Sequence, residues 1–136
     1  GKARDEREDF PIDGAQIGTL IGRGGARVRE LSRLSGAFIK FETDPPRMVV
    51  GGTQKQRKEA CRIVGEWLKE IGEDTLPLDV SLHGILIGPQ GKRIKGIEAE
   101  TGAMVRFEKK PVAGMVVRGT KSEREAAIGL ANDAVA

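Results

Sequence analysis

Ile21-Gly22-Arg23-Gly24-Gly25 is the stretch of sequence that decides the fold. The two outer glycines, Gly22 and Gly25, permit backbone angles that are closed to other residues, and they remove side chains that would hold a ligand away. Apolar residues at helical spacing predict a short helix over residues 15–21 before this loop and a second helix over 26–35 after it. The loop therefore opens onto a helix N-terminus, where free N–H groups and the helix dipole favour an anion such as a phosphate.

Strands and one long helix are expected around this helix pair. Alternating apolar residues and turn signals predict strands over residues 9–13, 37–41 and 47–50. Gly36 ends the second helix in the manner of a C-terminal glycine cap. Thr53 is the predicted N-cap of a final helix that runs to about Ile71. Its inner face is expected to contain Ala60, Val64, Trp67 and Ile71.

The chain repeats itself after a shift of 66 residues. Between residues 9 and 42, 12 of 34 positions are identical to the positions in the second copy. The second copy of the loop is Ile87-Gly88-Pro89-Gln90-Gly91. Two copies are too few for a solenoid, which needs at least about three, so the repeat predicts two small globular domains over residues 8–72 and 73–136. The second domain's first strand is expected to begin near Thr75 or Leu76.

The net charge of +3 is too small to indicate a nucleic-acid partner by itself, but the charge is unevenly distributed. Residues 17–41 and 83–107, which surround the two loops, together carry +6, whereas the rest of the chain carries −3. Positive charge is therefore focused on two equivalent segments, as binding along a phosphate backbone requires.

The composition argues against an enzyme. One His, one Cys and no Tyr leave little material for a nucleophilic triad or a metal-ligand cluster. The segment 88–92 lacks the first glycine and the final Ser or Thr of a P-loop. The sequence contains no apolar run of about 18 residues, the length that would indicate a membrane span. The single cysteine, Cys61, fits a reducing intracellular compartment, cytoplasm or nucleus. We expect no catalysis, no cofactor, no metal site and no membrane partner.

These motifs resemble the core signature of K-homology (KH) domains. The matching positions are Ile21–Gly25, Val28, Leu31, Ser35-Gly36-Ala37, Ile39 and Phe41, and then Ile87–Gly91, Ile94, Ile97, Thr101-Gly102-Ala103, Val105 and Phe107. The long last helix resembles the type I arrangement, and the short loops before the third strand resemble those of vigilin-type multi-KH proteins. The resemblance implies an α+β fold, with each domain a β-α-α-β-β-α unit whose three-stranded antiparallel sheet packs on three helices.

The resemblance also implies a function and a site. In KH domains the glycine loop clamps the sugar-phosphate backbone of about four nucleotides, and the bases lie in an apolar groove that is too narrow for a duplex. The expected partner is single-stranded RNA, with single-stranded DNA as an alternative. The site residues implied in the first copy are Gly18, Ile21, Gly22, Arg23, Gly24, Gly25, Arg27, Val28, Arg29, Ile39, Lys40 and Phe41. Those implied in the second copy are Gly84, Ile87, Gly88, Pro89, Gln90, Gly91, Lys92, Arg93, Ile94, Lys95, Val105, Arg106 and Phe107.

The two copies differ in ways that bear on function. The second loop carries no charge, and its Pro89 lacks an N–H donor. We therefore expect weaker binding by the second domain and keep open a protein-interaction scaffold as the other function, with protein partners reached through that domain. His83 stands where the first copy has Ile17, and we expect it to be packed rather than to touch a base.

Overall fold

The computed structural model describes residues 6–136 and divides into two compact units between Lys69 and Glu70. The first unit contains β1 (Arg7–Pro11), α1 (Gly14–Ile21), α2 (Ala26–Ser35), β2 (Phe38–Thr43), β3 (Pro46–Gly51) and α3 (Gln54–Glu70). The second contains β4 (Gly72–Pro77), α4 (Val80–Ile87), α5 (Lys92–Thr101), β5 (Met104–Glu108), β6 (Gly114–Gly119) and α6 (Lys121–Val135). The predicted β-α-α-β-β-α order is confirmed in both units.

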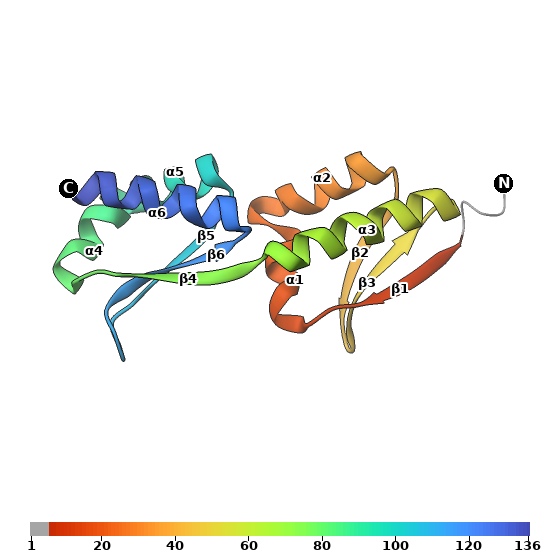
Figure 1. The fold of residues 1–136 in the computed structure, drawn as a ribbon, viewed down its shortest axis with the longest axis horizontal. Helices are drawn as coiled ribbons and strands as arrows, with labels where there is room; N and C mark the ends of the chain where they lie inside the picture. Colours follow the sequence, from red (N-terminus) through yellow and green to blue (C-terminus); the bar gives the residue numbers. More distant parts are fainter. Residues whose placement is uncertain (1–5) are drawn as a thin grey trace. The chain divides into compact units, whose positions relative to one another are not determined.

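Each unit has one antiparallel sheet with its helices on one face (Figure 1). The strand orders are β1-β3-β2 and β4-β6-β5, so the third strand of each unit lies in the middle of its sheet. In the first unit Met48 of β3 is flanked by Phe10 and Phe41, and Val50 is flanked by Ile39. Because side chains alternate along a strand, these residues face the helices and their neighbours in sequence face away.

The core of each unit lies between the sheet and the helices. In the first unit the fully buried apolar side chains are Leu20, Leu31, Met48, Val50, Ala60 and Val64. In the second they are Leu86, Ala103, Met115, Val117, Ala127 and Ala131. Trp67 of α3 is half-buried, and Ile71 lies beyond the end of the helix, which corrects its expected place on the inner helical face.

The final helices begin with the same N-terminal hydrogen bonds. The Thr53 hydroxyl accepts from the N–H of Gln56, whose side chain accepts from the N–H of Thr53. Thr120 and Glu123 form the same reciprocal pair at the start of α6. The predicted N-cap at Thr53 is therefore confirmed, and the arrangement is a capping box in both units.

An arginine, buried in the first unit and partly buried in the second, links each final helix to the first strand of its unit. Arg57 donates to the carboxylates of Glu8 and Glu6, at 3.0 and 3.1 Å, and to the carbonyl of Gly52. Arg124 donates in the same way to Asp74, to the carbonyl of Gly119 and to the carbonyl of Glu70. A buried guanidinium needs such partners, but the sequence did not point to either arginine.

The first strand of each unit begins earlier than the sequence predicts. The strand expected over residues 9–13 is β1, Arg7–Pro11, and the strand expected near Thr75 or Leu76 begins at Gly72. Gly72, Glu73 and Asp74 pair with the central strand β6 although they show no apolar alternation. Backbone pairing across the sheet extends the strand there, and only residue 71 separates α3 from β4. None of the helices described is long and apolar enough to cross a membrane.

Candidate nucleic-acid interface

The two glycine loops have the same backbone conformation. Gly22 and Gly88 end the first helix of each unit with φ values of 78° and 72°. A 3₁₀ turn follows, and the last loop residue, Gly25 or Gly91, is left-handed with φ of 80° or 73°. Three positive φ values within four residues require glycine or a tolerant residue. The second helix of the pair begins directly after each loop, so its N-terminal N–H groups face the loop.

Close packing requires glycine at the first position of each loop. A Cβ atom on Gly22 would lie 2.8 Å from both the Cβ and the backbone nitrogen of Arg27. A Cβ atom on Gly88 would lie 2.8 Å from the Cβ of Arg93. These distances are far below van der Waals contact, so any side chain at this position would push the loop away from the second helix.

The third loop position tolerates a side chain. Gly24 has φ 61°, and the equivalent Gln90 has φ 57°, the one positive φ of a non-glycine residue within the described part of the chain. A Cβ atom on Gly24 would meet nothing within 4 Å. The second unit therefore shows that the loop keeps its shape with a side chain here, at the modest cost of a left-handed non-glycine residue.

Two of the predicted cationic site residues are used to hold the helices together. Arg27 of α2 donates from Nε to the carbonyl of Thr19 in α1, at 2.9 Å. Arg93 of α5 donates to the carbonyl of Ile85 in α4, at 3.2 Å. Because both guanidinium groups reach back across the first helix of the pair, their positive charge lies behind the loop rather than over it.

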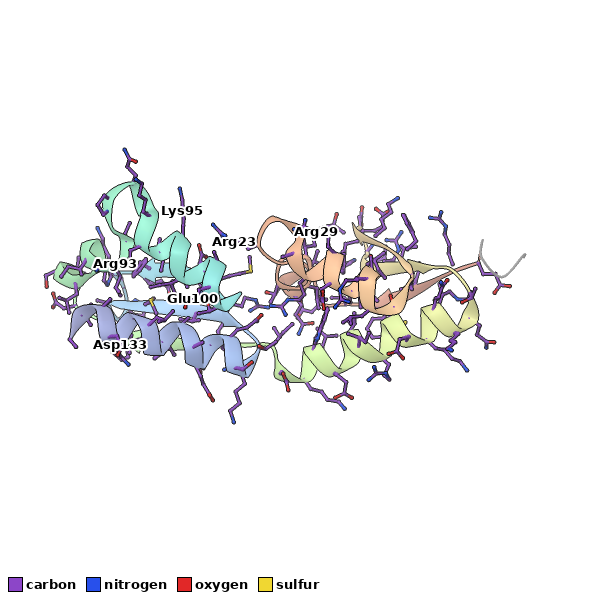
Figure 2. All side chains as sticks on the ribbon, turned by 90° about the horizontal axis from the view of Figure 1, so that it is seen from above. Arg23, Arg29, Arg93, Lys95, Glu100 and Asp133 are labelled. Carbon is purple, nitrogen blue, oxygen red and sulfur yellow. The ribbon has the colours of Figure 1, made fainter. Side chains whose placement is uncertain are left out.

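The other cations after each loop are exposed. Arg29 donates to the carbonyl of Gly24 at 2.6 Å, which places its guanidinium against the loop itself. Lys95 stands at the equivalent place and projects from α5 (Figure 2). Arg23 lies in the first loop, and Lys92 follows the second. Within residues 6–136 the side chain of neither Lys92 nor Lys95 forms an ion pair or hydrogen bond, so both ammonium groups are available to an anion.

Apolar side chains lie beside each loop on three elements that pack together. We call them the apolar strip, which consists of Gly18, Ile21, Val28, Ile39 and Phe41 in the first unit and Gly84, Ile87, Ile94, Val105 and Phe107 in the second. In each unit the second helix contacts the first helix before it and the strand after it. The strip is therefore continuous with the loop. Its large members are half-buried, apart from Ile87, which is 37% exposed.

Gly18 and Gly84 have no packing reason to be glycine. Both are exposed helical residues, and a Cβ atom on either would meet nothing within 4 Å. Glycine within a helix is less stable than alanine by about 0.8–1 kcal/mol. A ligand that approaches the helix backbone closely at this position would account for that cost.

Two predicted rim cations lie on the other face of the sheet. Lys40 alternates with Ile39 and Phe41 and pairs with Glu42 at 2.8 Å. Arg106 pairs with Glu73 at 2.9 Å, and this guanidinium holds the pKa of the Glu73 carboxyl below its usual value, aided by Arg118. The structure therefore separates Lys40 and Arg106 from the helix-facing side chains of the apolar strip.

His83 and Cys61 belong to the packed interior. His83 is 5% exposed, its Nε2 lies 2.9 Å from the carbonyl oxygen of Leu78, and its ring packs against Phe107. The expectation that His83 is packed is thus confirmed. Burial raises the pKa of the half-buried Cys61 thiol, which disfavours its reactive thiolate form. No cluster of three or more metal-ligating side chains occurs within residues 6–136.

The KH domain family model matches residues 7–66 and 73–133, so the chain belongs to the KH domain family and contains two copies of the domain. It is 27% identical over 132 residues to the Tudor and KH domain-containing protein homolog of Bombyx mori, covering 88% of this chain and 21% of that protein. It is 22% identical over 137 residues to human far upstream element-binding protein 2, covering 74% of this chain and 19% of that protein. The chain thus spans about a fifth of the length of the curated relatives that it matches.

Two solved structures are also similar to this chain. The 14th KH type I domain of human vigilin is 25% identical, with a TM-score of 0.41, and the match covers 50% of this chain and 79% of that domain. Dim2p from Pyrococcus horikoshii is 18% identical, with a TM-score of 0.41, and the match covers 96% of this chain and 91% of that one.

Proposed function

We propose that this chain binds single-stranded RNA through both glycine loops and catalyses no reaction. Membership of the KH domain family supports nucleic-acid binding, as does the similarity to a far upstream element-binding protein. The observation that carries the proposal is the repeated loop, whose left-handed backbone leads straight into a helix N-terminus beside exposed cations and an apolar strip. Phosphate groups would lie against the loop and bases against the strip.

The first domain is the stronger binder in this proposal. Its loop carries Arg23, and Arg29 lies against the loop carbonyl. In the second loop Pro89 removes one N–H donor, and positive charge comes only from Lys92 and Lys95 on the following helix. The rim in our proposal consists of Arg29 and Lys95, whereas Arg27 and Arg93 act by positioning the loops.

The test is a doubly substituted loop. Arg23→Asp with Gly24→Asp puts two negative charges where a phosphate should lie, and the conformation of Gln90 shows that a side chain fits at the second of these positions. We expect the affinity for fluorescein-labelled RNA 10-mers, measured by anisotropy, to fall about tenfold or more. Pro89→Asp with Gln90→Asp also puts two negative charges in the second loop, although it changes the net charge by −2 instead of −3 because Pro89 is uncharged. We expect it to have a smaller effect.

A matched control separates the loop from the overall charge. Lys58→Asp with Gly65→Asp makes the same change in net charge on α3, at an exposed lysine and at a glycine with open space beside it. Circular dichroism should show all three variants folded, and the α3 variant should bind as tightly as the parent chain. Unchanged affinity in the folded Arg23 and Gly24 variant would rule out the proposed clamp. Equal or tighter binding of DNA 10-mers of the same sequences would overturn the preference for RNA.

A further inference from the structure

A surface pocket lies between α5 and α6 of the second domain. Its volume is about 500 Å³, within the usual range for ligand pockets of roughly 300–1,000 Å³. The residues that line it are Lys92, Arg93, Gly96, Ile97, Glu100, Leu130, Asp133 and Ala134. Figure 2 labels Arg93 and Glu100 on α5 and Asp133 on α6. The pocket shares Lys92 and Arg93 with the proposed RNA site, but its other lining residues lie outside the loop and the apolar strip. Those residues call for a separate explanation.

The first domain fills the equivalent space with its own side chain. Arg27 aligns with Arg93 at the repeat's offset of 66 residues. The second copy has one extra residue in a later loop, and after it Trp67 aligns with Ala134. In the first domain the Arg27 guanidinium lies over the Trp67 ring, 5.6 Å from its centroid, which is cation–π geometry. In the second domain alanine replaces the ring, and the arginine borders an open pocket.

The rest of the pocket suits a flat apolar group. Ile97 and Leu130 line it where the first domain has Leu31 and Ile63, so an apolar surface is kept in both domains. Gly96 leaves the wall open, since a Cβ atom there would meet nothing within 4 Å. An apolar surface beside a guanidinium is the environment that aromatic rings prefer, and the first domain shows such a ring in place.

The charges around the pocket indicate which macromolecule would supply the ring. Glu100 and Asp133 line it together with Lys92 and Arg93. The two cations and two carboxylates balance, so the pocket has no net positive charge to attract the phosphates that accompany every base of a nucleic acid. Its carboxylates can instead pair with lysine or arginine residues next to an aromatic residue in a protein. We propose that this pocket receives an aromatic side chain, preferably an indole, from a basic segment of a partner protein.

The probe for this proposal is the peptide acetyl-Lys-Gly-Trp-Gly-Lys-amide, titrated into the ¹⁵N-labelled 136-residue chain. We expect saturable shifts of the Gly96 and Ala134 amide signals. The same peptide with Leu in place of Trp should bind about fivefold more weakly, because it loses the cation–π contact. The peptide with Glu in place of both Lys residues should also bind more weakly.

Two variants provide the matched comparison. Ala134→Trp places the first domain's own side chain in the pocket, so it should raise the denaturation midpoint of the second domain and abolish the peptide-induced shift of Gly96. Asn132→Trp adds the same side chain at an exposed position on α6 outside the pocket lining, and it should leave peptide binding unchanged. RNA binding should be unaffected by Ala134→Trp, which makes failure of this proposal distinguishable from failure of the RNA proposal.

Several results would overturn the aromatic pocket. These are an absence of saturable shifts, equal binding of the Leu and Trp peptides, or undiminished peptide binding by a folded Ala134→Trp chain. Shifts of Gly96 and Ala134 caused by an RNA oligonucleotide, and not by the peptide, would show that the pocket receives a nucleobase, which would also contradict the proposal.

Discussion

Gly18 and Gly84 are the residues at which the proposed RNA binding and the stability of the fold make different demands. Each is an exposed glycine within a helix, with open space where a side chain would be. Local stability favours almost any other residue at these positions. In our proposal, the bare backbone beside the glycine loop instead allows the close approach of a nucleotide.

Replacing Gly18 by leucine should therefore separate binding from folding. Leucine is a good helix former, so we expect the stability of the first domain in urea to stay equal or rise by up to about 1 kcal/mol. RNA affinity measured by anisotropy should fall about tenfold, because the side chain would occupy the space of a nucleotide. Gly65→Leu on α3 is the control, since that glycine also has open space beside it. Equal RNA affinity in the two variants would show that Gly18 is not part of the binding surface.

The loop was predictable from the sequence because glycine spacing reports backbone conformation directly, whereas the roles of the cations were not. Arg27 and Arg29 are two residues apart, and nothing in the sequence assigns them different roles. In the structure Arg27 donates back to Thr19, whereas Arg29 lies against Gly24. Lys40 looked like a rim residue until the strand register placed it opposite Val49, on the face away from the helices. Side-chain direction depends on tertiary packing, which a single sequence does not state.

At the scale of elements, the final helix of each domain is held by its arginine link and its capping box. Arg57 has a side chain that is only 10% exposed, and it joins α3 to two glutamates of the first strand region. The sequence predicted the helix and its N-cap from local signals. It could not predict the arginine link, because the partners lie about 50 residues away and no local pattern marks them.

Arg57→Ala should destabilise the first domain by about 1–3 kcal/mol, the usual cost of leaving a hydrogen-bond partner unsatisfied. Most of the loss comes from the unpaired Gly52 carbonyl and from lost packing of the side-chain stem, because the glutamate partners are largely exposed. Arg124→Ala is the equivalent change in the second domain and should have a similar cost. Chemical denaturation followed by circular dichroism measures both. A cost below about 0.5 kcal/mol, typical of exposed surface changes, would contradict the structural role of the link.

At the scale of the whole molecule, each domain has a complete core of its own, and one tryptophan, Trp67, reports on the first. Leu86 is fully buried in the second core. Leu86→Ala should therefore cost the second domain about 2–5 kcal/mol. We expect circular dichroism to show earlier loss of helix in urea, while the midpoint of the tryptophan fluorescence transition stays at its original value. A matching shift of the fluorescence midpoint would mean that the two cores unfold together.

The near absence of a linker has a practical consequence for dissecting the protein. Arg124 donates to the carbonyl of Glu70, which is the last residue of α3 and the first residue of the second compact unit. Cutting the chain between residues 72 and 73 would remove that acceptor and the first residue of β4 from the second half. We propose instead that a second domain made by itself should begin at or before Glu70. A first domain ending at Lys69 would lose only one residue of α3. The second domain is therefore the one that needs Glu70, because Glu70 accepts the hydrogen bond from Arg124.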